Sequence, residues 1–314
     1  MKAYRLRTAS IFVILTLFMV AIGYVIGWFF GYGYLGFGIM LVISVLMSFF
    51  SYFFSKQSAL VANRVHLVTR EEEPKLYSIV EKVANEAGLP MPEVGISEVS
   101  MPNAFATGRN PKNAAVVATR GILRILSDDE LEGVIGHEMS HVKNRDILVM
   151  SVASCMVSVL TYAARMFFYG TMFGAGDRDR DNNAVMLVIA VLCAILAPIA
   201  GLILQLAVSR NREYLADETG ARITGKPLDL ANALRKLESG CMNNPNNHYN
   251  DTAHANMWIS NPCREGFMVR MFSTHPSTDE RIRRLEILAD AMSKGSVPAY
   301  TPDEDSSSTK LSYQ

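Results

Sequence analysis

Residues 127–143 read SDDELEGVIGHEMSHVK, and this segment decides the fold. Ser127, with Glu130 three residues later, forms a capping-box signal that opens a helix. The predicted helix carries His137 and His141 four residues apart, so both imidazoles lie on one face. The pattern H-E-x-x-H on a helix is the spacing at which two histidines bind one metal ion. The segment therefore predicts a helix built around a metal site.

Glu138, between these histidines, has the chemistry of a general base. It points toward the position of a water molecule beside the metal, so it can take a proton from that water and pass it to a leaving amine. Zinc is the expected ion, because two neutral imidazoles and one carboxylate leave a fourth tetrahedral position open. The alternative is a chance match, which ordinary residue frequencies give on the order of once in a hundred chains of this length. Spacing alone thus indicates a zinc hydrolase.

Such a site needs a third protein ligand. The extended motif would require glycine at 144 and histidine at 147, where this chain has Asn144 and Ile147, so a metzincin-type site is excluded. The other common third ligand is a glutamate on a later helix, and the segment NREYLAD at 211–217 offers Glu213. Asp217 lies one helical turn further along on the same face, where it can orient a ligand imidazole. The alternative for either acid is a solvated helix face.

Long uncharged runs indicate membrane helices. No charged residue occurs in the 48 residues from Thr8 to Ser55, about twice the roughly 20 residues that one spanning helix needs. Two helices, at about 9–30 and 35–54, fit this run, and a cleaved signal peptide is disfavoured because a second span follows at once. Basic residues flank the hairpin while its turn has none, so both ends are expected to face the cytoplasm.

Two further uncharged runs have the length of spans, at 147–164 and 182–209. Arg165 and Pro198 make partial embedding an alternative to full crossing. If the ligand helices continue into these runs, His141 and Glu213 lie roughly 10 Å from hydrocarbon at about 1.5 Å per residue. Substrates would then be loops or termini of membrane proteins.

The polar remainder is expected to form one α+β domain from two pieces. A helix is predicted at 72–88, and short strands at 93–98, 104–107 and 115–119. The strand 115–119 is the candidate edge onto which an extended substrate adds, with a buried core strand as the equal alternative. A second capping-box signal, at Ser277 and Glu280, opens a helix to about Met292. The expected organisation is a hairpin at 1–55, catalytic parts at 56–146 and 210–294, a second hairpin at 147–209 and a disordered tail at 295–314.

Composition excludes other classes of protein. Half of the residues are apolar and 19% are charged, which fits membrane segments joined to one domain. Lys and Arg number 30, and Asp and Glu also number 30, so no basic field favours a nucleic acid as partner. Four cysteines without close pairing indicate no disulfide scaffold.

Several motifs, in order along the chain, resemble the HtpX family of bacterial membrane metalloproteases. They are NAFATG at 103–108, ATRG at 118–121, HEMSH at 137–141, NREYLAD at 211–217, and FSTHP at 272–276 leading to Arg281. The resemblance spans nearly the whole chain. It implies a gluzincin-type zinc endopeptidase of the bacterial inner (plasma) membrane, multi-pass, with its active site facing the cytoplasm and a role in stress-linked removal of damaged membrane proteins.

The family pattern is kept at the expected site positions. The resemblance implies that His137, His141 and Glu213 bind Zn²⁺ and that Glu138 is catalytic, with Asp217 beside them. His275 falls in the family's THP motif, where it is expected to support a metal ligand or to donate to the transition state near the metal, with a cap of the following helix as the alternative. Arg281 either braces the site or pairs with an acid on the surface. The other histidines are expected to be solvated or interfacial, at His66, His248 and His254.

The predicted protein is a membrane zinc metalloendopeptidase with two to four membrane helices that hydrolyses damaged or misfolded membrane proteins at the cytoplasmic face. Expected partners are membrane-protein substrates, the lipid bilayer and other quality-control proteases. One alternative is a dedicated processing peptidase of the prenyl-protein protease type, although an enclosing chamber would need more spans. Another is a non-catalytic membrane scaffold, although a structural zinc site is usually closed by four protein ligands and would leave Glu138 without a role.

Overall fold

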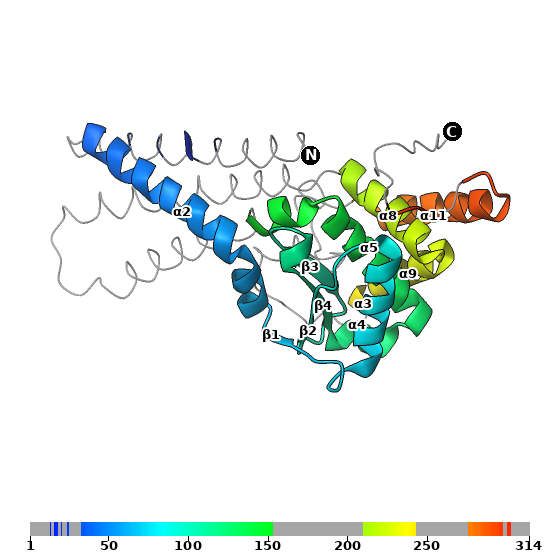
Figure 1. Cartoon of the computed structure of the whole chain (residues 1–314). Helices are drawn as coiled ribbons and strands as arrows, with labels where there is room; N and C mark the ends of the chain where they lie inside the picture. Colours follow the sequence, from blue (N-terminus) through cyan, green and yellow to red (C-terminus); the bar gives the residue numbers. More distant parts are fainter. Residues whose placement is uncertain are drawn as a thin grey trace.

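The computed structural model describes residues 33–152, 210–242, 276–297 and 300–302, with isolated positions between 13 and 24. Helix α2 (Gly33–Ala62) is the one helix of this part that is long and apolar enough to cross a membrane, over Phe37–Ala62. Figure 1 shows α2 projecting from the other labelled elements, and most of its large apolar side chains are exposed. The helix expected at 35–54 is thus longer than predicted. Most of the first expected span and all of 153–209 lie outside the described residues.

Among the described residues, four strands form one mixed sheet in the order β1-β2-β4-β3. The strands are β1 (Val65–Leu67), β2 (Glu93–Ser97), β3 (Ala104–Gly108) and β4 (Ala114–Thr119). Strands β2 and β4 are parallel, and the other two pairs are antiparallel. Because β4 has a partner on each side, the expectation that 115–119 is a free edge is wrong. The edge of the described sheet on this side is β3.

Helices cover the sheet and build the core around one central helix (Figure 1). They are α3 (Pro74–Ala87), α4 (Arg120–Ile125), α5 (Asp128–Lys143), α8 (Arg210–Thr224), α9 (Pro227–Met242) and α11 (Thr278–Ser293). Helix α5 packs against α3, α8, α9 and β3. Its apolar side chains, including Val134, Ile135 and Met139, are fully buried. The segment with the H-E-x-x-H pattern is therefore the core helix of the domain.

The two predicted capping boxes have different outcomes. At α5 the box is complete, because the Ser127 hydroxyl accepts a hydrogen bond from the Glu130 N–H and the Glu130 carboxylate accepts one from the Ser127 N–H. At α11, Ser277 is the N-cap residue but its side chain makes no capping hydrogen bond. The carboxylate of Glu280 instead pairs with two arginines of its own helix, Arg283 and Arg284. The capping-box prediction at Ser277 is therefore wrong.

Helix α5 does not continue into the hydrophobic run that follows it. It ends at Lys143, and the chain turns at 144–145, where Arg145 has a left-handed φ of 60°. A new helical stretch covers 146–152, and Ile147 is completely buried in the domain core. The distance of roughly 10 Å from His141 to hydrocarbon assumed one continuous helix. That assumption is wrong on the α5 side.

Part of the tail that was expected to be disordered packs against the domain. Tyr300 donates a hydrogen bond to the Ala87 carbonyl oxygen at the end of α3, at 3.2 Å. Lys143 Nζ, at the end of α5, donates to the Pro302 carbonyl oxygen at 2.6 Å. Residues 303–314 lie outside the described part of the chain.

Candidate active site

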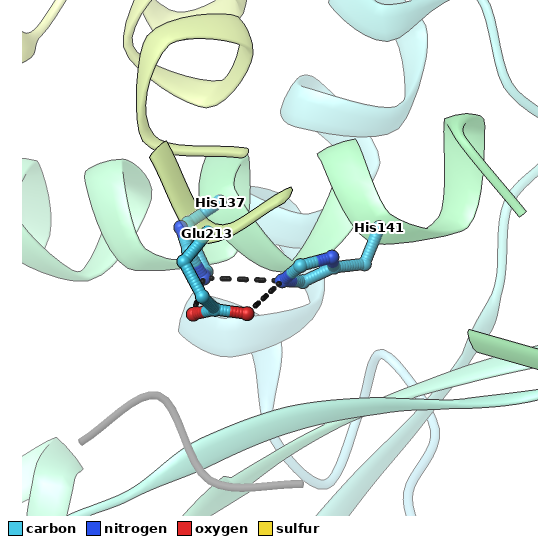
Figure 2. Close-up of side chains that lie close together, drawn as sticks. All are labelled: His137, His141 and Glu213. Atoms are coloured by element: carbon cyan, nitrogen blue, oxygen red, sulfur yellow. Dashed lines mark hydrogen bonds and ion pairs between the residues drawn. The ribbon is translucent and has the colours of Figure 1, made fainter. Parts of the chain in front are cut away.

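Helices α5 and α8 bring two imidazoles and one carboxylate together. The Nε2 atoms of His137 and His141 are 3.3 Å apart. The Glu213 carboxylate lies 3.8 Å from His137 Nε2 through Oε2 and 3.6 Å from His141 Nε2 through Oε1. Figure 2 shows the three side chains pointing toward one another, and at most 4% of any of them is exposed. The glutamate predicted as the third group therefore does reach the histidine pair.

Both imidazoles have a carboxylate at their second nitrogen. His137 Nδ1 lies 2.9 Å from Asp217 Oδ1, and His141 Nδ1 lies 3.4 Å from Asp146 Oδ2. A carboxylate accepts a hydrogen bond from Nδ1–H, so the lone pair of each neutral ring is on Nε2, the atom that faces the centre. Burial lowers the pKa of His137, which also favours the neutral ring. Both rings are thus arranged as metal ligands are.

Arg281 is buried beside this cluster, where it braces Asp217. Its Nε and Nη2 atoms each donate a hydrogen bond of 2.7 Å to the Asp217 carboxylate, and Nη2 lies 3.5 Å from His137 Nδ1. Burial alone would raise the pKa of Asp217, but Arg281 and His137 together hold it below its ordinary value. Asp217 therefore stays ionised and able to accept a hydrogen bond from the imidazole N–H. Two roles were expected for Arg281, bracing the site or pairing with an acid on the surface. The structure shows the first, because Arg281 is buried and binds Asp217.

Glu138 lies next to the three converging groups and is tied to the sheet. The Ala106 N–H of β3 donates a hydrogen bond of 2.8 Å to Glu138 Oε2. Glu138 is 3% exposed, and burial raises the pKa of its carboxyl group to about 8. A cation bound by its neighbours would favour the charged carboxylate again. Glu138 can therefore take up and release a proton close to neutral pH.

The donor set fits zinc. The ligand-type atoms of His137, His141 and Glu213 all lie within 4.8 Å of one another. Two imidazole nitrogens and one carboxylate are a donor set that zinc takes in hydrolytic sites. All three residues are buried, and the Nδ1 partners of both imidazoles leave Nε2 available. The cluster is therefore a suitable site for a divalent cation.

The other predicted positions fall into two groups. His66 lies exposed on β1 and is not one of the residues of the cluster. His248, His254 and His275 lie outside the described residues.

Sequence reasoning did not identify Asp146 as a partner of His141, although an acid five residues beyond the second histidine, just past the helix end, is a usable signal.

The family profile and the curated relatives agree on one family. The profile of peptidase family M48 matches residues 70–289, which include every residue of the cluster. The chain is similar to a protease HtpX homolog of Thermococcus sibiricus, with 46% identity over 91% of this chain and 97% of that protein. It is 48% identical to a homolog of Pyrococcus furiosus, over 90% and 95%, and 43% identical to one of Sulfurihydrogenibium sp., over 93% and 99%. The crystal structure of S. mikatae Ste24p matches with a TM-score of 0.49 and 17% identity, over 90% of this chain and 66% of that one.

Proposed function

The chain belongs to peptidase family M48 and to the HtpX homologues within it, and it is a metalloprotease; from this premise, we propose a specific function. It is a zinc-dependent endopeptidase, embedded in the inner (plasma) membrane by several spans, that hydrolyses damaged or misfolded membrane proteins at the cytoplasmic face as part of a stress response. Its partners are its membrane-protein substrates, the lipid bilayer and other quality-control proteases.

One observation carries the catalytic part of this proposal: two imidazoles and the Glu213 carboxylate converge in a buried cluster next to Glu138. His137, His141 and Glu213 would hold zinc. When bound, zinc would act as a Lewis acid that polarises the scissile carbonyl group and makes water more acidic. Asp217 would keep the His137 imidazole oriented with Nε2 toward the ion.

Glu138 would be the general base. Its carboxylate takes a proton from the attacking water and then passes it to the amine that leaves from the cleaved peptide bond. The Ala106 N–H fixes one oxygen of this carboxylate against β3. No covalent intermediate with the chain is needed for this reaction.

The substrate would bind along β3 rather than β4. In an antiparallel pair, every second residue points its N–H and C=O groups away from the partner strand. Ala106 of β3 lies opposite Val116 of β4, but its N–H donates to Glu138, so Ala106 is one of these outward-facing residues. A peptide that adds to this outer edge would run past the Glu138 carboxylate, and it would bond to main-chain groups other than the N–H of Ala106 and the N–H of Gly108, which donate to Glu138 and Ser151. Recognition through main-chain hydrogen bonds imposes little sequence preference, which suits an enzyme that removes damaged proteins of many sequences.

The location in a membrane is supported by α2, whose large apolar side chains are mostly exposed over a length sufficient to span. Its orientation is supported by basic residues on both sides of the first hairpin, at Lys2, Arg5, Arg7, Lys56, Arg64 and Arg70. With both ends of the hairpin at the cytoplasmic face, the catalytic domain would lie on that side.

The experiment uses the full chain purified in detergent. Zinc content is measured, and cleavage of an unfolded membrane protein is followed for the wild type and for Glu138→Gln. We expect the variant to keep its zinc and to lose at least about a hundredfold in rate, because a general base contributes that much. Equal cleavage by the variant contradicts the role of Glu138, and a wild type that binds no zinc contradicts the proposed metal.

A further inference from the structure

The two candidate ligand histidines are held by carboxylates from different parts of the chain. Asp217, the partner of His137, belongs to the ligand helix α8. Asp146, the partner of His141, lies beyond the end of α5, at the first residue of the helical stretch 146–152. It is 3% exposed, so its charge is buried next to the cluster. A buried carboxylate in this place requires partners of its own.

Those partners come from both ligand helices. Asp146 Oδ2 faces His141 Nδ1 of α5, and Asp146 Oδ1 contacts the guanidinium of Arg212. Arg212 is the residue next to Glu213 in α8. One carboxylate therefore connects the second histidine with the helix that supplies the third ligand group. The arrangement parallels the chain of contacts from Arg281 through Asp217 to His137.

The contact between Asp146 and Arg212 also joins two segments that are far apart in the sequence. Asp146 comes directly before the hydrophobic insertion at 147–209, and Arg212 follows shortly after it. The left-handed turn at Arg145 lets the chain fold back from α5, so that Asp146 returns beside His141. Near the other end of the same stretch, the Ser151 hydroxyl lies 2.9 Å from Thr107 Oγ1 and accepts a hydrogen bond from the Gly108 N–H of β3 at 3.2 Å.

We propose that Asp146 is a positioning residue for His141, and that its contact with Arg212 joins the residues that flank the hydrophobic insertion. The carboxylate fixes the imidazole with Nε2 toward the metal. This inference rests on the proposed function, because it requires His141 to bind the ion.

The test measures zinc affinity of the full chain in detergent by competition with a coloured chelator. Asp146→Ala should weaken zinc binding by about 10- to 100-fold, the usual effect of losing an outer partner of a ligand. Asp146→Asn keeps an acceptor oxygen and should fall between Asp146→Ala and the wild type. Ser151→Ala is the matched control: it lies in the same stretch, is equally buried, and loses its bonds to β3 without touching a ligand histidine. We expect it to bind zinc as the wild type does.

The outcomes separate this inference from the proposed function. Wild-type affinity in Asp146→Ala overturns the inference, and so does an equal loss in Ser151→Ala, which would indicate general loosening of the stretch. If Asp146→Ala does not fold, as judged by circular dichroism, Asp146→Asn decides: weaker binding supports the role, and unchanged binding overturns it. A wild type that binds no zinc overturns the inference through the proposed function. Zinc binding unchanged by both Asp146 variants overturns the inference alone.

Discussion

Gly136 of α5 and Gly220 of α8 meet backbone to backbone. A Cβ atom on Gly220 would lie 2.6 Å from the carbonyl carbon of Gly136 and 2.6 Å from the nitrogen of His137. A Cβ on Gly136 would lie 2.9 Å from the Gly220 carbonyl oxygen. Two glycines thus allow the two helices to approach closely enough for Glu213 to reach the histidine pair. The geometry of the site depends on this contact.

Gly220→Ala should therefore push α8 away from α5. We expect the free energy of unfolding to fall by about 1–3 kcal/mol, the usual cost of overpacking, and zinc binding to weaken as Glu213 moves. Chemical unfolding in detergent measures the first effect. Gly38→Ala in α2 is the control, because a Cβ there has nothing within 4 Å. Wild-type stability in Gly220→Ala would contradict the tight contact.

The buried pair of Arg281 and Asp217 predicts a large effect of removing the arginine. Arg281→Ala leaves the Asp217 charge buried beside the cluster without its bidentate partner, at a cost of about 3–5 kcal/mol in unfolding free energy. Arg281→Lys should recover only part of the lost unfolding free energy, because an ammonium group cannot make the bidentate contact. Arg283→Ala, which removes an exposed arginine of the same helix, should cost less than about 1 kcal/mol. Equal losses of unfolding free energy in Arg281→Ala and Arg283→Ala would contradict the prediction that the buried pair of Arg281 and Asp217 stabilises the fold more than an exposed pair does.

The two helix starts at Ser127 and Ser277 provide a matched pair. Ser127→Ala removes a capping hydrogen bond and should cost about 1 kcal/mol in unfolding free energy. Ser277→Ala should cost much less, since the Ser277 side chain makes no such bond. Thermal unfolding of both variants measures the difference. Similar losses at the two serines would be inconsistent with the different caps.

Metal removal should lower stability as well as activity. A ligand that binds only the folded state at about 100 times its Kd adds about 2.7 kcal/mol of stability. We expect zinc to raise the Tm of the metal-free protein, a chelator to reverse this and abolish cleavage, and Glu138→Gln to respond to zinc as the wild type does. Absence of any zinc-dependent change in Tm would argue against a site in the folded core.

Local patterns predicted the local structure well. Helix α5 and its capping box follow from the order of residues in 127–143, and β2, β3 and β4 lie within one residue of the expected strands. The glutamate expected near the histidines was found because a metal site demands a third donor, and NREYLAD is a helical segment with acids one turn apart.

Relations between distant segments were harder to predict. Strand order depends on long-range packing, so β4 could not be distinguished from an edge strand by its own sequence. The roles of Gly136 and Gly220 depend on where two helices cross, which no local pattern states. The contact of Asp146 with His141 was not predicted, because the prediction continued helix α5 straight into the hydrophobic run. In the structure the chain turns at Arg145 and brings Asp146 back beside His141.

The central claim is that His137, His141 and Glu213 together bind one divalent cation. It is tested most directly by the zinc stoichiometry and affinity of Glu213→Gln, compared with the wild type and with Glu218→Gln, a buried acid of the same helix that does not belong to the cluster. We predict one zinc per chain in the wild type and in Glu218→Gln. In Glu213→Gln, binding should be more than about 100-fold weaker, because losing a ligand exceeds the effect of losing its outer partner. Zinc binding in Glu213→Gln as tight as in the wild type would contradict the claim.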